Sequence, residues 1–184
     1  MLNAVDYLSK YSDLITNNDA IMTLQNVGRL LFEAREKKQR LFFTGNGASS
    51  SISSHAALDF TKQGKLTAFS FTDPALVSAY SNDYGFENAQ TEIFKSYREE
   101  GDILVLVSTS GNSLNVVNLA RFGRLNGHQV VSLTGKDPNN LLRTESDYSL
   151  WVNSHAYNMV ENVHMIWLGY LIDCLVGSEV YAVS

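Results

Sequence analysis

The stretch LVLVSTSGNSLNVV, residues 104–117, runs from an apolar segment into a loop of small hydroxyl residues and then into helical spacing. The five apolar residues at 103–107 predict the core of a buried β-strand. After the loop, Leu114, Val117 and the residues that follow predict a helix that ends near Gly127. A strand, a loop and a helix in this order are typical of a parallel sheet covered by helices.

The same alternation of strands and helices extends along most of the chain. Four further segments predict strands, namely RLFFTGNG at 40–47, LTAFSF at 66–71, HQVVSLTG at 128–135 and DYSLWV at 147–152. Helices are predicted between them, with a loop at Ser81–Gly85, and a long helix is predicted over 160–176. Strands joined by helices indicate an α/β fold with a parallel sheet covered on both faces.

Residues 2–38 have the spacing of helices and precede the first predicted strand. The segment TNNDA separates two of these helices, and Asn18 or Asp19 is the predicted cap of the second. A shared apolar face is predicted for Leu8, Ile15, Ile21, Leu24, Val27, Leu30, Leu31 and Ala34. With 184 residues, we expect one domain over 1–184, made of a helical segment at 1–38 and an α/β core at 39–184.

Composition and charge exclude several classes of protein. Hydrophobic residues make up 45% of the chain and charged residues 18%, which disfavours disorder. A formal net charge of −5 disfavours direct binding of nucleic acid, which needs a basic face. We see neither a signal peptide nor an uninterrupted apolar segment of the ~20 residues that cross a membrane, so the expected location is the cytoplasm.

The loop STSGNS, residues 108–113, places four hydroxyl side chains around Gly111 at the start of a predicted helix. These are Ser108, Thr109, Ser110 and Ser113. Unpaired amides and the dipole at a helix N-terminus favour an anion, and a phosphate is the natural candidate. The alternative is that Ser110 or Ser113 only caps the helix, but a cap requires a single hydroxyl.

The second glycine-containing loop, TGNGASSS at 44–51, follows another predicted strand. It resembles a dinucleotide-binding loop only weakly, because the third glycine is missing and no acidic residue ends the next strand. Neither loop is followed by the lysine of a nucleoside triphosphate site. We therefore expect no nucleotide cofactor, and neutral donors suit a phosphate ester.

Four motifs, GNGASS, SNDYGFENA, GDILVLVSTSGNS and VVSLTGKD, together resemble the SIS (sugar isomerase) domain family, and within it the phosphoheptose isomerases. The resemblance implies a three-layer α/β/α sandwich around a five-stranded parallel sheet, and a homotetramer. It also implies a sugar-phosphate site. Its substrate-binding residues would be Asn46, Gly47, Ser49, Asn82, Asp83, Ser108, Thr109, Ser110, Ser113 and Glu161.

At the positions that carry the family's catalysis, this chain departs from the pattern. Asp59 stands where the family has a glutamate that acts as the catalytic base. It follows His55 by four residues, a spacing that puts both side chains on one helical face. The shorter carboxylate weakens its positioning as a base. Glu161 replaces a glutamine, and Gly169 replaces the histidine that acts as the acid.

A different side chain would then have to supply the acid. His155, Tyr157 and His164 lie close in sequence, although a histidine on an apolar helix, such as His164, is more often a hydrogen-bonded core residue. The resemblance also implies a zinc site, for which His55, Asp59 and Glu161 are the candidate ligands. A salt-bridged cluster without metal is the alternative.

Three functions remain open on the sequence alone. Overall likeness favours an isomerase that interconverts sedoheptulose 7-phosphate and an aldose, with Asp59 as the base. Asp59 and Gly169 favour a protein that binds a sugar phosphate without turnover, as a sensor or as an interaction module with a protein partner, such as a regulator of replication initiation. The third function is isomerisation of another sugar phosphate in the space left at Gly169.

Overall fold

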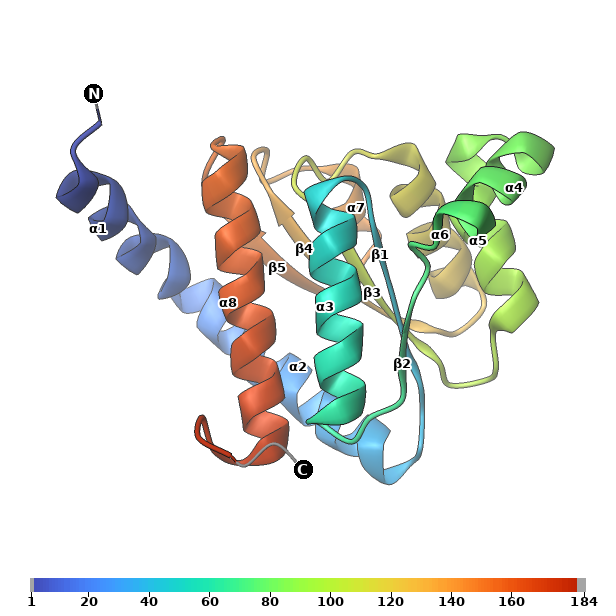
Figure 1. Cartoon of the computed structure of the whole chain (residues 1–184), viewed down its shortest axis with the longest axis horizontal. Helices are drawn as coiled ribbons and strands as arrows, with labels where there is room; N and C mark the ends of the chain where they lie inside the picture. Colours follow the sequence, from blue (N-terminus) through green and yellow to red (C-terminus); the bar gives the residue numbers. More distant parts are fainter. Residues whose placement is uncertain (1, 182–184) are drawn as a thin grey trace.

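The computed structural model describes residues 2–181 as five parallel strands with helices on both faces (Figure 1). The strands are β1 (Leu41–Gly45), β2 (Ala68–Ser70), β3 (Ile103–Ser108), β4 (Gln129–Gly135) and β5 (Tyr148–Val152), in the order β2-β1-β3-β4-β5. The predicted three-layer α/β/α sandwich is confirmed. Because the strand order reverses between β1 and β3, the fold opens a crevice at the carboxyl ends of these two strands.

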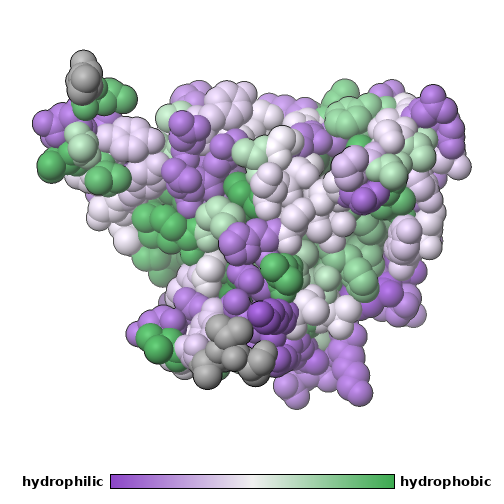
Figure 2. Space-filling view, viewed as in Figure 1, coloured by the Kyte–Doolittle hydropathy of each residue, from purple (hydrophilic) through white to green (hydrophobic). Residues whose placement is uncertain are grey.

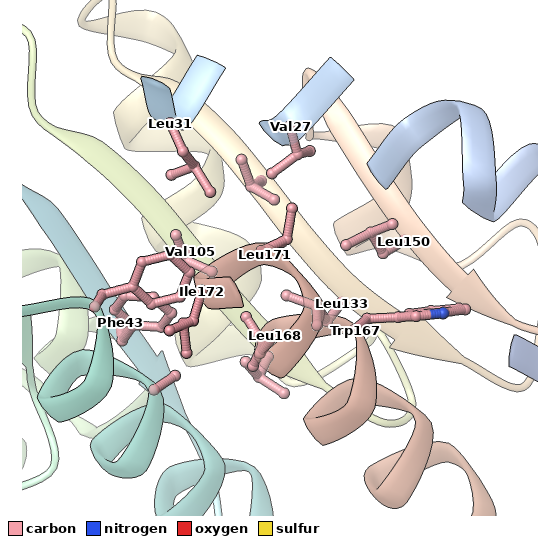
Figure 3. Close-up of a cluster of buried hydrophobic side chains, with 14 of the residues drawn as sticks. Val27, Leu31, Phe43, Val105, Leu133, Leu150, Trp167, Leu168, Leu171 and Ile172 are labelled. Carbon is pink, nitrogen blue, oxygen red and sulfur yellow. The ribbon is translucent and has the colours of Figure 1, made fainter. Parts of the chain in front are cut away.

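The helices are α1 (Ala4–Ile15), α2 (Asn18–Glu36), α3 (Ala48–Lys62), α4 (Pro74–Tyr84), α5 (Phe86–Tyr97), α6 (Leu114–Leu125), α7 (Leu141–Thr144) and α8 (Tyr157–Val176). On one face of the sheet, α2, α3 and α8 bury a large apolar cluster. In Figure 3, Leu168 and Leu171 of α8 lie among side chains from α2 and from the strands. On the other face, α5, α6 and α7 cover a second cluster around Phe42 and Phe94.

In α8, the buried side chains face the sheet. Among residues 2–181, α8 is the one helix that is long and apolar enough to cross a membrane. Val163, Trp167, Leu171 and Leu175 instead lie buried against the strands and against α2 and α3. This is the placement of a core helix in a soluble α/β domain.

Several predicted boundaries differ from the structure for local reasons. The predicted loop at Ser81–Gly85 is wrong, because α4 continues to Tyr84 and only Gly85, at φ +80°, breaks the chain. The cap of α2 is Asn17, whose side chain accepts the Ala20 N–H at 2.8 Å, rather than Asn18 or Asp19.

The predicted apolar face is confirmed only in part at α1, where Ile15 is half-buried against the core but Leu8 is not covered. No residue of α1 is buried, and Leu8 is 63% exposed. Ile21 of α2 is exposed as well. In Figure 1, α1 projects away from the sheet, so Val5 and Leu8 in its first half stay exposed, whereas Tyr11, Leu14 and Ile15 near its end pack against the core.

Candidate functional site

A polar pocket of about 160 Å³ lies at the carboxyl ends of β1 and β3, where the strand order reverses. Three segments line it, namely the loop after β1 with the start of α3, the loop after β3, and the first two turns of α8. The lining residues are Asn46, Ser49, Ser108, Thr109, Ser110, Ser113, Tyr157 and Glu161. The fold thus brings together both hydroxyl-rich loops that the sequence singled out.

The loop after β3 is held in a tight turn by its own backbone. Gly111 has φ +65°, and its N–H donates to the carbonyl of Ser108 at 2.9 Å. The hydroxyl of Ser110 accepts the N–H of Asn112 at 3.2 Å. Ser113, the residue before α6, makes no side-chain cap, so capping is not what its hydroxyl does. Its hydroxyl accepts a long hydrogen bond of 3.4 Å from the hydroxyl of Ser108, so both side chains lie together at the pocket.

The loop after β1 approaches the pocket through glycines and a paired amide. A Cβ on Gly45 would lie 2.7 Å from the Cβ of Ser49, so only glycine allows this close turn. Gly47 precedes α3 at φ +56°. Asn46 exchanges two hydrogen bonds of 2.9 Å with Asn115 of α6. The buried Asn115 therefore fixes Asn46, a role for which the sequence carried no signal because Asn115 is remote from the loop.

The helices that begin at this pocket lack side-chain caps. The side chains of the residues before α3, α6 and α8 make no capping hydrogen bond. Helix α5 also lacks a side-chain cap, but its residues do not line the pocket. By contrast, side chains cap α1, α2, α4 and α7. Uncapped N-terminal amides carry partial positive charge, so three of them around one pocket favour an anionic ligand.

Glu161 is the one charged side chain that lines the pocket among the described residues. Its carboxylate lies 3.5 Å from the hydroxyl of Thr109, which can donate to it. None of the described residues that line the pocket is a lysine or an arginine. A phosphate would therefore be held by neutral hydroxyls and main-chain amides, and Glu161 would face the remainder of the ligand.

Comparison with known proteins shows the family of this chain. The model of the SIS domain matches residues 6–135 of the chain. The chain belongs to the SIS domain family. It is 31% identical to a phosphoheptose isomerase of Akkermansia muciniphila over 164 residues, which cover 86% of each protein. It is 32% identical to one of Helicobacter pylori strain P12 over 152 residues, which cover 79% of each.

Solved structures share the architecture of this SIS domain. A phosphoheptose isomerase from Neisseria gonorrhoeae superposes with a TM-score of 0.82 at 23% identity, covering 94% of this chain and 92% of that one. The Vibrio vulnificus NanR protein, solved in complex with ManNAc-6P, superposes with a TM-score of 0.69 at 21% identity, covering 96% and 60%. At these identities the likeness concerns the fold.

His164 of this SIS domain lies in the core and not in the pocket. Its ring is fully buried, and Nε2 lies 3.1 Å from the carbonyl oxygen of Thr134. Burial lowers the pKa of His164 from 6.5 to about 4, although the bond to Thr134 opposes this shift. The structure therefore places the imidazole as a neutral donor that ties α8 to β4. It does not place His164 as a catalytic acid of this pocket.

We expect His164 to make stability depend on pH. Its folded pKa lies below its unfolded value, so its contribution is complete above about pH 6.5 and is lost as the pH falls toward 4. The free energy of unfolding should fall by about 2–3 kcal/mol between about pH 7.5 and pH 4.5 from this group. Urea titrations across this range measure it. His164→Gln should remove this pH-dependent loss of stability, whereas His155→Gln, which replaces an exposed histidine, should not. If the free energy of unfolding depends on pH equally in the natural chain and in both variants, His164 is not the group responsible.

The proposed base and its partner lie on the body of α3, away from the pocket. Asp59 is ten residues beyond Ser49, which corresponds to about 15 Å along a helix. His55 Nε2 pairs with Asp59 at 3.0 Å, and Gln63 donates to the other carboxylate oxygen at 3.3 Å. Within one chain, Asp59 therefore does not meet the pocket.

The predicted zinc ligands do not converge within the described chain. Among residues 2–181, no three His, Cys, Asp or Glu side chains form a metal-binding group. His55 and Asp59 face each other on α3, whereas Glu161 lines the pocket beside Thr109. A single chain therefore does not fit zinc, because its candidate ligands belong to two separate places.

Asn82 and Asp83 were predicted beside the sugar, but the structure places them elsewhere. Both are exposed on the last turn of α4, where the Asn82 amide donates to Asp83 at 3.0 Å. Neither lines the pocket. The family resemblance implied this role for both residues, and within a single chain they lie on α4 outside the pocket.

Proposed function

We propose that this SIS domain binds a sugar phosphate in the pocket after β1 and β3 and interconverts its ketose and aldose forms, with sedoheptulose 7-phosphate as the substrate. The observation that carries the proposal is the convergence of five Ser and Thr hydroxyls and three uncapped helix N-termini on one pocket, whose described lining residues include no lysine or arginine. The phosphoheptose isomerases among its relatives supply the reaction class.

The roles of the residues follow from their positions. Ser108, Ser110 and Ser113 bind the phosphate together with the amides of their loop, and Asn46 and Glu161 face the sugar. Isomerisation through an enediol needs a base that removes a carbon-bound proton and an acid that serves the oxygens. In this proposal Asp59 is the base, and no step depends on a metal.

Asp59 must then come from another copy of the chain. Apolar side chains on α1, on the segment before it, on α3 and on α8 remain uncovered in one chain, namely Leu2, Val5, Leu8, Leu58, Ile166 and Tyr170. Figure 2 shows such residues on the projecting α1. We propose that a homotetramer covers them and brings an α3 helix to a neighbouring pocket. The expected location stays the cytoplasm.

A binding protein without turnover is the second candidate, and Gly169 favours it. The space beside Gly169 is open, with nothing within 4 Å of the position of a Cβ. No acid stands there, and Asp59 is shorter than the glutamate that it replaces. Such a protein would keep the phosphate site and respond to its ligand by binding a protein partner.

A gain-of-function experiment separates the two candidates. Turnover of sedoheptulose 7-phosphate is measured for the natural chain, with and without added zinc, and for Asp59→Asn, which should be about 100-fold slower. Because the site at Gly169 is open, the pair Asp59→Glu and Gly169→His should raise turnover by about 10-fold or more, whereas Gly169→Ala should not.

Each outcome decides between the candidates. Turnover that depends on Asp59 supports the isomerase. Ligand binding without turnover, in the natural chain and in the double variant alike, supports the binding protein. If calorimetry detects no binding of any sugar phosphate, both candidates are wrong.

A further inference from the structure

Tyr157 is the one aromatic residue among the described residues that line the pocket. It is the first residue of α8, and it lies one turn before Glu161 on the same side of that helix. Its side chain is 56% exposed and belongs to neither of the two apolar clusters. Packing of the core therefore does not explain why an aromatic side chain stands at this position.

Lys136 fixes the orientation of this ring. Its ammonium group lies 3.6 Å from the centroid of the Tyr157 ring, well inside the range of a cation–π contact. Lys136 directly follows β4, and its N–H donates to the carbonyl of Ser154 at 3.0 Å. That bond holds the lysine beside the segment that leads into α8.

The backbone of Lys136 is strained, with φ +56°. Among residues 2–181, Lys38 and Lys65 share this feature, but both follow the ends of helices, where a left-handed residue is common. Lys136 instead ends a strand beside the pocket. A non-glycine residue in this conformation at a ligand site is typical of a position that the site requires.

We propose that Tyr157, positioned by Lys136, recognises the carbohydrate portion of the ligand whose phosphate binds at residues 108–113. The inference rests on the proposed sugar-phosphate function. One face of the ring is covered by the ammonium group, so the sugar contacts the other face and the hydroxyl. A phenol suits this task because its ring packs against C–H groups while its hydroxyl bonds to sugar hydroxyls.

The test compares two ligands that differ only in the part that Tyr157 contacts. Isothermal titrations use inorganic phosphate and sedoheptulose 7-phosphate with the natural chain, Tyr157→Phe and Tyr157→Ala. Tyr157→Ala should weaken binding of the sugar phosphate about 10-fold, while affinity for inorganic phosphate stays within about twofold. Tyr157→Phe should lie between, because it keeps the ring and loses the hydroxyl.

Variants of Lys136 test its positioning role. Lys136→Met keeps the strained backbone and removes the charge, so it should weaken the sugar phosphate about threefold, and Lys136→Arg should restore affinity. Combined with Tyr157→Ala, Lys136→Met should cause no further loss, because the lysine acts through the ring. Lys38→Met, at the same φ of +56° on the surface, is the matched control and should change nothing.

Two results would overturn the inference while leaving the proposed function intact. One is an unchanged affinity of Tyr157→Ala for the sugar phosphate, and the other is an equal loss for both ligands. A natural chain that binds neither ligand would instead remove the proposed function, and this inference with it.

Discussion

Gly111→Ala is expected to abolish phosphate binding and to lower the free energy of unfolding by about 3–5 kcal/mol. Gly111 has φ +65°, a conformation that costs alanine about 1–2 kcal/mol. A Cβ at this position would overlap the side-chain amide of Asn140. The loop after β3 would have to move, and the residues that line the pocket would move with it.

The Asn140 side chain cannot move aside easily, because it is buried and both its amide nitrogen and its amide oxygen are hydrogen-bonded. It is 1% exposed, its amide donates to the carbonyl of Asp137 at 2.7 Å, and its Oδ1 accepts the N–H of Arg143 at 3.0 Å. Displacing it leaves these buried groups without partners, at a cost of about 1–3 kcal/mol for each.

Gly127→Ala is the matched control for this prediction. Gly127 also has a positive φ, of +79°, but nothing lies within 4 Å of its Cβ position. Gly127→Ala should therefore lower the free energy of unfolding by only about 1 kcal/mol and leave phosphate affinity unchanged. Urea unfolding and phosphate titration of both variants decide the matter. Equal losses of stability would mean that Asn140 does not confine the loop.

Arg40→Met is expected to lower the free energy of unfolding by about 3–5 kcal/mol without altering phosphate affinity. Two nitrogens of Arg40 donate to the two carboxylate oxygens of Asp102, at 2.9 and 2.7 Å. Asp102 is 1% exposed, and its hydrogen bond with Arg40 is the main reason why the pKa of the arginine is raised. Loss of Arg40 leaves a buried carboxylate unpaired.

This pair ties β1 to β3 at the amino ends of the strands, opposite the pocket, which is why stability and binding should separate. Asp102→Asn in the Arg40→Met background should recover part of the loss, because it removes the unpaired charge. Arg121→Met breaks a more exposed pair with Glu145 and should cost less than about 1 kcal/mol. A loss of similar size for both arginines would contradict the argument from burial.

Local sequence was sufficient for most of the fold. Strands such as residues 103–107 are continuous apolar runs because both faces of a parallel sheet are covered, so the pattern itself indicates the environment. Boundaries were less certain where two local preferences compete. The polar segment before Gly85 has the composition of a loop, yet α4 continues through it, and the break falls only at the glycine.

The sequence likewise indicated some residues of the candidate site and missed others. Hydroxyl residues at 108–113 and the glycines at 45–47 carry their chemistry in consecutive positions, so the sequence was sufficient to place them after buried strands. Tyr157 was only a nearby candidate, and Asn115 carried no signal, since each acts on a segment that is distant along the chain.

The order of residues by itself determined the α/β architecture, the hydroxyl-rich loop proposed to bind phosphate and the glycine at position 169, because each of these lies within a single element. Only the tertiary structure decided that both loops share one pocket, that His164 is a buried neutral donor, and that Asp59 lies about 15 Å along α3 from Ser49. The physical reason is that spacing along the chain fixes where residues lie within one helix or strand. Contacts between residues of different elements depend instead on the strand order and on which helix faces are buried.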